Sequence, residues 1–354
     1  MRCPPLVSVP WLSSRLSSVL VVDASWYLPA MGRNGRDEFE TKRIPGARFF
    51  DVDATDDTSS LPHMLPSDAY FSDTMSRLGI SKADHVVCYD AKGIFSSARL
   101  WWMLRAYGHE QASDALHTTS HNHTLLHSTS LTHHPSYSRA GVSRITHHLS
   151  HTTRSYIAHL LHTAPLQQAS VLDGGLPAWE RAGEPVLRGA PTAAASADSY
   201  QGTLRSELVC SRQRMCDLVA QISERPPLPP PLPPPPRVID ARSQARFEGT
   251  VAEARKGCRS GHIPGSRSLP FDRTLAEDGT MLPVEKLEPL FAEAGVENIN
   301  APLIGTCGSG VTASVLALAL AHMGREQLLE IYDGAWAEWG GDQSLPLATG
   351  PPTG

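Results

Sequence analysis

The sequence lacks the features that mark membrane-spanning, nucleic-acid-binding and disulfide-rich proteins. Its 354 residues contain no run of about 18 apolar residues, the length that a membrane-spanning helix needs. The 31 lysines and arginines are outnumbered by 36 aspartates and glutamates, so no basic surface for DNA or RNA is indicated. The six cysteines follow neither a zinc-binding spacing nor a dense disulfide pattern, which favours a reducing compartment. We therefore expect neither membrane nor nucleic-acid partners.

Four short motifs recur in the same order in the two halves of the chain. The first half has Val-Val-Asp-Ala at 21–24, Arg-Ile-Pro-Gly-Ala at 43–47, Val-Val-Cys-Tyr-Asp at 86–90 and Val-Leu-Asp-Gly-Gly at 171–175. The second half has Val-Ile-Asp-Ala at 238–241, His-Ile-Pro-Gly-Ser at 262–266, Leu-Ile-Gly-Thr-Cys at 303–307 and Ile-Tyr-Asp-Gly-Ala at 331–335. An ordered repeat of this kind indicates a duplicated unit. Because short apolar strands alternate with helical stretches in each unit, we predict two α/β domains with mostly parallel sheets flanked by helices.

The segment 307–313, Cys-Gly-Ser-Gly-Val-Thr-Ala, joins an apolar, β-compatible run to an Ala- and Leu-rich helical run. Gly308 and Gly310 let the backbone curl, so that successive N–H groups point into one small cup that suits anions. The helix expected to begin near Val311 adds its positive N-terminal end. Both effects favour a thiolate at Cys307, so the pattern predicts a reactive cysteine. A structural cysteine beside a glycine turn is the alternative.

The residues after Cys307 limit the group that it can transfer. Cysteine phosphatases need an arginine six residues after the cysteine to grip phosphate, and that position is Ala313 here. The loop is uncharged and offers hydroxyl donors from Ser309 and Thr312. This composition points to sulfur as the transferred group.

The loop and its surroundings resemble the 3-mercaptopyruvate sulfurtransferases, a two-domain family of the rhodanese superfamily, over nearly the whole chain. The sister thiosulfate sulfurtransferases carry Arg and Lys after the cysteine, where this chain has Gly308 and Ser309. The mercaptopyruvate branch is therefore favoured, and the thiosulfate branch is the alternative. A noncatalytic rhodanese-like binding protein is a third hypothesis, although such relatives commonly lose the loop cysteine. The resemblance implies no metal and no organic cofactor.

The resemblance and the repeat together divide the chain into domains. Residues 6–190 are the expected N-terminal rhodanese-like domain, which is inactive because Asp90 takes the place of Cys307. Residues 191–203 are the expected linker, and 204–345 the C-terminal catalytic domain. Because the first residues run almost at once into what resembles the start of the folded enzyme, we expect a cytoplasmic protein, with a mitochondrial form as the alternative.

The resemblance also implies a substrate pocket for a 2-oxo acid, whose carboxylate and ketone need cationic and hydrogen-bonding partners. Arg246 and Arg255 match two substrate arginines of the family, and the guanidinium fork suits a carboxylate. His63 matches a substrate-pocket histidine. Surface arginines and a packed histidine are the alternatives. The remaining implied substrate-binding residues belong to the cysteine loop: Gly308, Gly310, Val311 and Thr312.

A catalytic relay follows from the same resemblance. Asp53, at the end of Phe-Phe-Asp-Val-Asp 49–53, matches an acidic residue that reaches across the domain interface toward the active serine. With Ser309 and Cys307 it would form a Cys-Ser-Asp relay that assists protonation of the pyruvate enolate after Cys307 has taken the sulfur as a persulfide. A thiol such as thioredoxin or glutathione, or cyanide, would then remove the outer sulfur. An exposed loop aspartate is the alternative for Asp53.

Two segments do not fit a compact enzyme. Residues 114–170 contain eleven of the sixteen histidines, at irregular spacing, and are flanked by Gln-Ala-Ser at both 111–113 and 168–170. We expect a poorly ordered insertion, which arises from an in-frame retained intron or gene-model error or else is a genuine disordered insertion, rather than a metal-binding tract. Residues 226–236, nearly all proline, are expected to form a polyproline II stretch in a surface loop, with an SH3-type ligand as the alternative.

Overall fold

The computed structural model describes residues 3–111, 166–191, 199–223, 235–325 and 327–352. The histidine-rich insertion, the polyproline stretch and the linker fall largely outside these residues. Residues Met1–Glu110 and Gln167–Gly354 together form one compact unit. Both large sheets and the candidate site lie in this unit.

The first domain is built on five parallel strands in the order β1-β7-β4-β2-β3. Its central strands are rich in Val and almost completely buried, as expected when helices cover both faces of a parallel sheet. The strands are β1 (Leu6–Val7), β2 (Leu20–Asp23), β3 (Arg48–Phe49), β4 (Val86–Tyr89) and β7 (Ala169–Leu172).

The second domain repeats this sheet, in the order β10-β9-β11-β12-β8 with all pairs parallel. Read from β8 to β10, each strand takes the place of its repeat counterpart, and β11 is central as β4 is. The strands are β8 (Val209–Cys210), β9 (Arg237–Asp240), β10 (Arg267–Ser268), β11 (Leu303–Thr306) and β12 (Glu330–Tyr332). The predicted tandem α/β domains with parallel sheets are confirmed.

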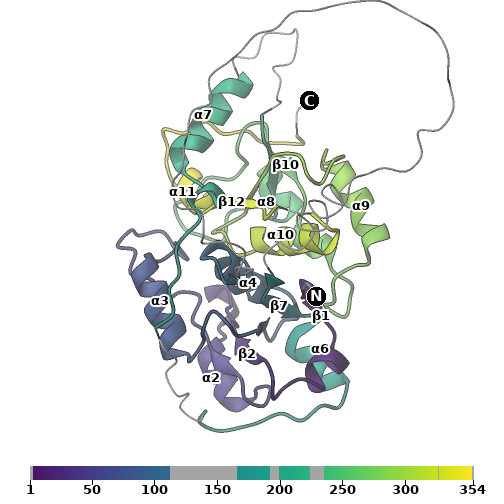
Figure 1. The fold of residues 1–354 in the computed structure, drawn as a ribbon. Helices are drawn as coiled ribbons and strands as arrows, with labels where there is room; N and C mark the ends of the chain where they lie inside the picture. Colours follow the sequence, from purple (N-terminus) through teal and green to yellow (C-terminus); the bar gives the residue numbers. More distant parts are fainter. Residues whose placement is uncertain (1–2, 112–165, 192–198, 224–234, 326, 353–354) are drawn as a thin grey trace, which may run out of the picture. The chain divides into compact units, whose positions relative to one another are not determined.

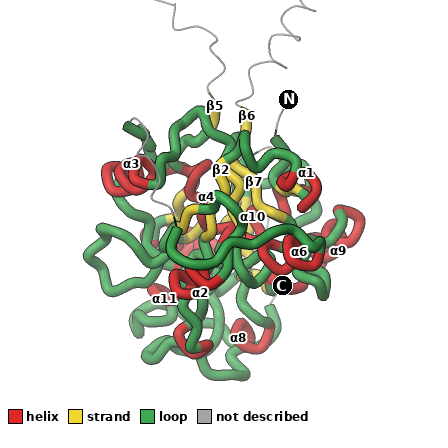
Figure 2. Tube along the Cα trace, turned by 90° about the horizontal axis from the view of Figure 1, so that it is seen from below, coloured by secondary structure: helices red, strands yellow, loops and turns green. Residues whose placement is uncertain are grey.

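The domains meet at their central helices, α4 (Ser97–Ala106) and α10 (Ala313–His322), which lie side by side in Figures 1 and 2. Every residue of α4 is buried, because one side covers its own sheet and the other packs on the second domain. Trp102 of α4, for example, donates from Nε1 to the carbonyl of Leu329, 2.9 Å away. Within the described part of the chain, every helix is too short or too polar to cross a membrane.

The remaining helices surround the two sheets (Figure 1). Those of the first domain are α1 (Val9–Ser13), η1 (Pro29–Met31), α2 (Gly35–Thr41), α3 (Asp68–Arg77) and α6 (Gly175–Arg181). Those of the second are η2 (Ser206–Leu208), α7 (Arg212–Ser223), α8 (Gln244–Glu248), η3 (Phe271–Thr274), α9 (Val284–Glu293) and α11 (Ala335–Trp339). A separate small sheet pairs β5 (Glu110–Gln111) with β6 (Leu166–Gln167).

One boundary differs from the sequence analysis. Ala169 and Ser170, assigned there to the end of the insertion, belong to β7 and pair with Val86 and Val87 of β4. The difference arises because Gln-Ala-Ser occurs at both ends of the inserted segment. The sequence alone cannot tell which copy enters the sheet.

The aspartates in the two copies of the Asp-Ala motif have different neighbours two residues later in the sequence. Asp240 is paired with Arg242 at 2.6 Å in the core, whereas the residue two positions after Asp23 is Ser25. Burial raises the pKa of Asp23 to about 7, although hydrogen bonds from Ser25 and Tyr89 oppose the rise. The folded state therefore keeps a proton that the unfolded chain releases near pH 4. The stability that this proton supplies is complete below pH 4 and is lost as the pH rises to about 7.

Substituting Asp23→Asn is expected to remove this pH dependence. When the pH is raised from 5 to 8, the free energy of unfolding of the variant should increase relative to that of the wild type by a few kcal/mol. The size follows because one pKa unit corresponds to about 1.4 kcal/mol. Urea unfolding at the two pH values measures it. Asp240→Asn is the matched comparison. It should destabilise the folded protein at both pH values, because it removes a charge partner of buried Arg242. An equal effect of Asp23→Asn at both pH values would contradict the prediction.

Candidate active site

The cysteine loop lies between β11 and α10, as predicted. Cys307 follows β11 directly and is 1% exposed. Its carbonyl accepts a hydrogen bond from Trp336 N at 2.9 Å, and the carbonyl of Gly308 accepts one from Ala337 N at 2.9 Å, which fixes the loop to the start of α11. Helix α10 begins at Ala313, two residues later than expected, because Val311 and Thr312 form a turn before it. The expected stabilisation of the Cys307 thiolate by this loop stays a prediction.

The two loop glycines serve different purposes. Gly310 has a φ of 78°, in the left-handed region that favours glycine, so it supplies the predicted curl. Gly308 is outside that region, and a Cβ there would lie 3.4 Å from Arg246 Nη2, which is an ordinary van der Waals distance. The cup therefore depends on Gly310 for its backbone turn, and Gly308 forms the surface against which the arginine packs.

Ser309 is linked to Asp53 through His63. The Oγ of Ser309 is 2.7 Å from Nδ1 of His63, and Nε2 of His63 is 2.8 Å from Oδ1 of Asp53. The other carboxylate oxygen of Asp53 accepts a hydrogen bond from Trp26 Nε1 at 2.9 Å. Ser309 and Asp53, two members of the expected relay, are therefore joined through an imidazole, and both His63 and Asp53 come from the first domain. Proton transfer along this path stays a prediction.

The position of His63 differs from the substrate-pocket role that the resemblance implied. Its side chain is 2% exposed, and it is absent from the described residues that line the pocket beside Cys307. The reason is that both ring nitrogens are occupied, one by Ser309 and the other by Asp53, while Trp26 packs edge-on against the ring at a centroid distance of 4.4 Å. Gly310 is likewise absent from the described lining, and its implied substrate contact stays a prediction.

The charge on Asp53 determines which groups donate and which accept in the hydrogen bonds that join Asp53, His63 and Ser309. Partial burial raises the pKa of Asp53, but the hydrogen bond and charge of His63, the indole of Trp26 and the charge of Arg255 together lower it below its ordinary value. An ionised Asp53 favours a proton on Nε2 of His63. Nδ1 is then left as an acceptor for the Ser309 hydroxyl, so the imidazole is arranged to take a proton from the serine.

A pocket of about 440 Å³ opens beside Cys307, between residues of both domains. Four cationic side chains line it against two acidic ones, so it suits an anion. The predicted residues Arg246 and Arg255 are both in the lining. So are the loop residues Cys307, Gly308, Ser309, Val311 and Thr312.

Glu253 holds the pocket arginine in place, and the sequence analysis did not identify it. One of its oxygens is 2.7 Å from Nη1 of Arg242, and the other accepts hydrogen bonds from Arg246. Arg242 is fully buried against the Trp336 ring, whereas the Arg246 side chain remains 26% exposed. One carboxylate thus holds two guanidinium groups, and Asp240, which pairs with Arg242, supplies the second negative charge of this cluster.

The first domain fills its own equivalent loop. Asp90 stands where Cys307 stands, and its carbonyl accepts from Leu176 N at 3.0 Å just as that of Cys307 accepts from Trp336. One carboxylate oxygen of Asp90 accepts hydrogen bonds from Phe95 N at 2.8 Å, Ser97 N at 2.9 Å and Ser97 Oγ at 2.7 Å. A side-chain anion of the protein itself therefore occupies the position at which the second domain presents a thiol.

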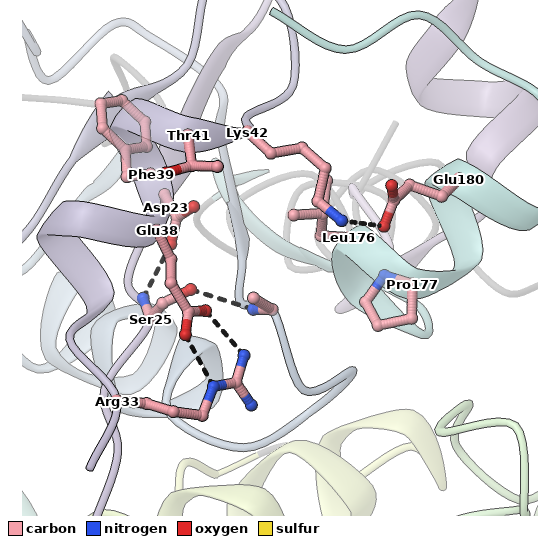
Figure 3. Close-up of a pocket in the computed structure, with 11 residues that line it drawn as sticks. Asp23, Ser25, Arg33, Glu38, Phe39, Thr41, Lys42, Leu176, Pro177 and Glu180 are labelled. Atoms are coloured by element: carbon pink, nitrogen blue, oxygen red, sulfur yellow. Dashed lines mark hydrogen bonds and ion pairs between the residues drawn. The ribbon is translucent and has the colours of Figure 1, made fainter. Parts of the chain in front are cut away.

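A smaller pocket of about 250 Å³ lies in the first domain, between α2 and α6 (Figure 3). Its two lysine and arginine side chains both point to acidic partners: Arg33 pairs with Glu38 at 2.6 Å and Lys42 with Glu180 at 2.8 Å. This arrangement neutralises the cations that an anionic substrate would need. Among the described residues, no group of three or more His, Cys, Asp and Glu side chains could hold a metal ion.

Comparisons with known proteins agree with this geometry. The model of the Rhodanese-like domain matches residues 9–115 and 227–342. The mitochondrial thiosulfate/3-mercaptopyruvate sulfurtransferase 1 of Arabidopsis thaliana is 35% identical over 97% of this chain and 78% of its own length. The human 3-mercaptopyruvate sulfurtransferase is 33% identical over 95% and 92%. The crystal structure of SseA from Escherichia coli, described as a 3-mercaptopyruvate sulfotransferase, aligns with a TM-score of 0.66 at 28% identity, covering 94% of this chain and 99% of SseA.

Proposed function

The chain belongs to the rhodanese-like family, and from that premise we propose that it is a 3-mercaptopyruvate sulfurtransferase, with Cys307 as the sulfur-carrying nucleophile. The observation that carries this assignment is the hydrogen-bonded chain from Ser309 through His63 to Asp53 at the edge of the cationic pocket. Such a chain can deliver the proton that the pyruvate product must gain at carbon. The uncharged loop after Cys307 agrees with the same donor.

In the proposed cycle, the Cys307 thiolate attacks the sulfur of 3-mercaptopyruvate. An S–S bond forms, the C–S bond breaks, and its electron pair remains on the carbon of the pyruvate enolate. The proton of the substrate thiol passes to the Ser309 oxygen while the serine proton moves to Nδ1 of His63; reversal of this transfer delivers a proton to the enolate carbon. Asp53 stabilises the imidazolium that forms between the two transfers.

Substrate orientation is assigned to the two pocket arginines. Arg246, held by Glu253 and lying against Gly308, is placed to bind the carboxylate of the 2-oxo acid as a fork. Arg255 lines the same pocket and supplies the second cation. Gly308, Val311 and Thr312 form the wall beside the reacting sulfur. The roles of these residues belong to the proposal, and it is their place in the pocket that supports them.

Substituting Arg246→Lys is expected to weaken substrate binding more than chemistry. Lysine keeps the charge but loses the fork, so KM for 3-mercaptopyruvate should rise roughly 10- to 100-fold while kcat changes less. Steady-state pyruvate release measures both constants. Arg214→Lys is the matched control, because Arg214 forms an exposed ion pair with Glu330 outside the lining of the pocket. An unchanged KM in Arg246→Lys would contradict the assigned role.

A direct comparison of donors tests the function itself. Purified protein with a reducing acceptor should release pyruvate and sulfide from 3-mercaptopyruvate far faster than it uses thiosulfate. The reverse preference would place it with the thiosulfate sulfurtransferases, the alternative that the Arabidopsis name also mentions. Turnover with neither donor would favour a noncatalytic binding protein.

The acceptor and the compartment are part of the proposal. The outer sulfur is proposed to leave to a thiol such as thioredoxin or glutathione, or to cyanide, in the cytoplasm, with a mitochondrial form as the alternative. Six free cysteines support a reducing compartment, and the mitochondrial Arabidopsis relative supports the alternative. Fractionation of cells with an antibody against the chain separates the two locations.

A further inference from the structure

A buried ion pair lies behind the Ser309–His63 hydrogen bond. Arg99 is on α4 of the first domain, and Asp333 directly follows β12 of the second. Their side chains are 1% and 7% exposed, and Arg99 Nη2 is 2.6 Å from Asp333 Oδ1. The pair therefore crosses the domain interface away from water.

Both members of the pair hold the turn that carries His63. Arg99 Nη2 also donates to the carbonyl of His63 at 2.9 Å, and the backbone N–H of Leu65 donates to Asp333 Oδ2 at 2.9 Å. His63 has a φ of 57°, which residues other than glycine rarely adopt. Such a conformation persists only where its surroundings impose it. The ion pair imposes it from both sides of the turn.

The same pair contacts the cysteine loop. A Cβ at Gly310 would lie 3.1 Å from Arg99 Nη1 and 3.5 Å from the carbonyl oxygen of Asp333. Three residues after Asp333, Trp336 donates its backbone N–H to the carbonyl of Cys307. One guanidinium thus lies against both the loop that carries Ser309 and the turn that carries its partner.

The internal repeat shows that a link between the domains does not require this arginine. The counterpart of Asp333 in the first domain is Asp173, which accepts a hydrogen bond from Met281 N of the second domain at 2.8 Å. On α10, which corresponds to α4, the residues at this place are Val315 and Leu316, both of them apolar. The arginine is therefore present only in the copy of the link that faces Ser309.

Stability alone gives little reason for the ion pair. The cost of removing two charges from water usually offsets their attraction in the interior. Moreover, Nε and Nη1 of Arg99 have no hydrogen-bond partner among the described residues. We propose that Arg99, paired with Asp333, is a positioning residue that fixes His63 in the orientation in which Nδ1 accepts from Ser309. This inference rests on the proposed function, because it assigns Arg99 to the proton relay of that reaction.

Substituting Arg99→Lys tests the inference, because one ammonium group cannot reproduce the guanidinium contacts to both the His63 carbonyl and Asp333. We expect kcat for 3-mercaptopyruvate to fall roughly 30- to 100-fold, with KM within about threefold of the wild type. With thiosulfate, whose product needs no proton at carbon, turnover should stay within about threefold. In a His63→Gln background, Arg99→Lys should lower kcat for 3-mercaptopyruvate by less than about threefold more, because the two residues act as one unit.

Two matched controls separate positioning from packing. Arg105→Lys changes another buried arginine of α4, whose guanidinium lies over the Trp101 ring, and Asp173→Asn changes the equivalent link on the other side of the interface. Both should keep the ratio of mercaptopyruvate to thiosulfate turnover. Equal loss with both donors in Arg99→Lys, or a full additional loss in the His63→Gln background, would overturn the inference. If Arg99→Lys does not fold, Asp333→Asn replaces it in the same comparisons, alone and combined with His63→Gln.

A measurement without turnover separates this inference from the function on which it rests. The imidazole ¹⁵N resonances of His63, identified by their absence in His63→Gln, should move in Arg99→Lys and stay in place in Arg105→Lys. Unchanged His63 resonances would overturn the inference whichever donor the enzyme uses. Wild-type protein that releases no pyruvate from 3-mercaptopyruvate would overturn the proposed function, while the resonance shift would still report whether Arg99 orients His63.

Discussion

Replacement of Cys307 by serine is expected to abolish sulfur transfer while leaving the fold intact. A serine oxygen cannot carry the transferred sulfur as a persulfide, so turnover should fall roughly 10⁴-fold or more. The fold should tolerate the change because the loop is held by backbone hydrogen bonds, from Trp336 N to the Cys307 carbonyl and from Ala337 N to the Gly308 carbonyl. The measurement is pyruvate release, together with the mass of the protein after incubation with donor and no acceptor.

The wild type should gain the mass of one sulfur atom, and Cys307→Ser should gain none. Cys216→Ser is the matched control: Cys216 is a partly buried free cysteine on α7 that lies outside the pocket lining, so the variant should form the persulfide normally. Near-ultraviolet circular dichroism should show the same tertiary packing in all three proteins. Sulfur transfer that survives in Cys307→Ser would refute the assignment of the nucleophile.

The sequence was sufficient for the fold because its repeat falls on the central strands. β2 and β4 in the first domain, and their counterparts β9 and β11 in the second, are short apolar runs that coincide with the first and third of the four recurring motifs. Edge strands such as β1 and β8 are two residues long, too short to show a hydrophobic period, and they form because a neighbouring strand is already in place. The predicted end of the insertion fell two residues inside β7 because Gln-Ala-Ser occurs at both ends of the inserted segment.

The site was predictable where its chemistry is contiguous in sequence. Cys307, Ser309 and the loop glycines lie within a few residues of one another, and Arg246 follows the Asp-Ala motif of β9 at a short distance. The contact between His63 and Ser309 joins residues 246 positions apart, and no local pattern reports it. A resemblance could assign the histidine to the pocket, but not to the position between serine and aspartate.

The ion pair was missed for a different reason, since its signal was present in the sequence. Arg99 lies among Trp, Leu and Ala in a helix that is otherwise apolar at this point. A charged residue in such a helix is buried only if it is paired, so Arg99 required a carboxylate from another element. The sequence could not supply the identity of that carboxylate, because Asp333 approaches from the other domain.

Removing the serine hydroxyl or the imidazole is expected to slow pyruvate formation strongly. Ser309→Ala and His63→Gln should each lower kcat for 3-mercaptopyruvate roughly 10²- to 10³-fold, because loss of a positioned proton donor and acceptor typically costs this much. The double variant should be little worse than either single one, since the two groups act in one chain. Asp53→Asn should slow the same step, because an amide no longer holds on Nε2 of His63 the proton that leaves Nδ1 as the acceptor of the Ser309 hydroxyl.

Thiosulfate distinguishes a proton relay from general damage to the site. Both donors load the same Cys307, but only the pyruvate enolate must gain a proton at carbon. Ser309→Ala and His63→Gln should therefore keep most of their turnover with thiosulfate, and the solvent isotope effect on mercaptopyruvate turnover should have no counterpart with thiosulfate. The ionised state of Asp53 adds a pH criterion: its lowered pKa keeps the carboxylate charged throughout the neutral range, so an activity loss between pH 6 and 8 cannot come from its protonation. Equal losses with both donors would show that the serine and histidine shape the loop around Cys307 instead of moving a proton.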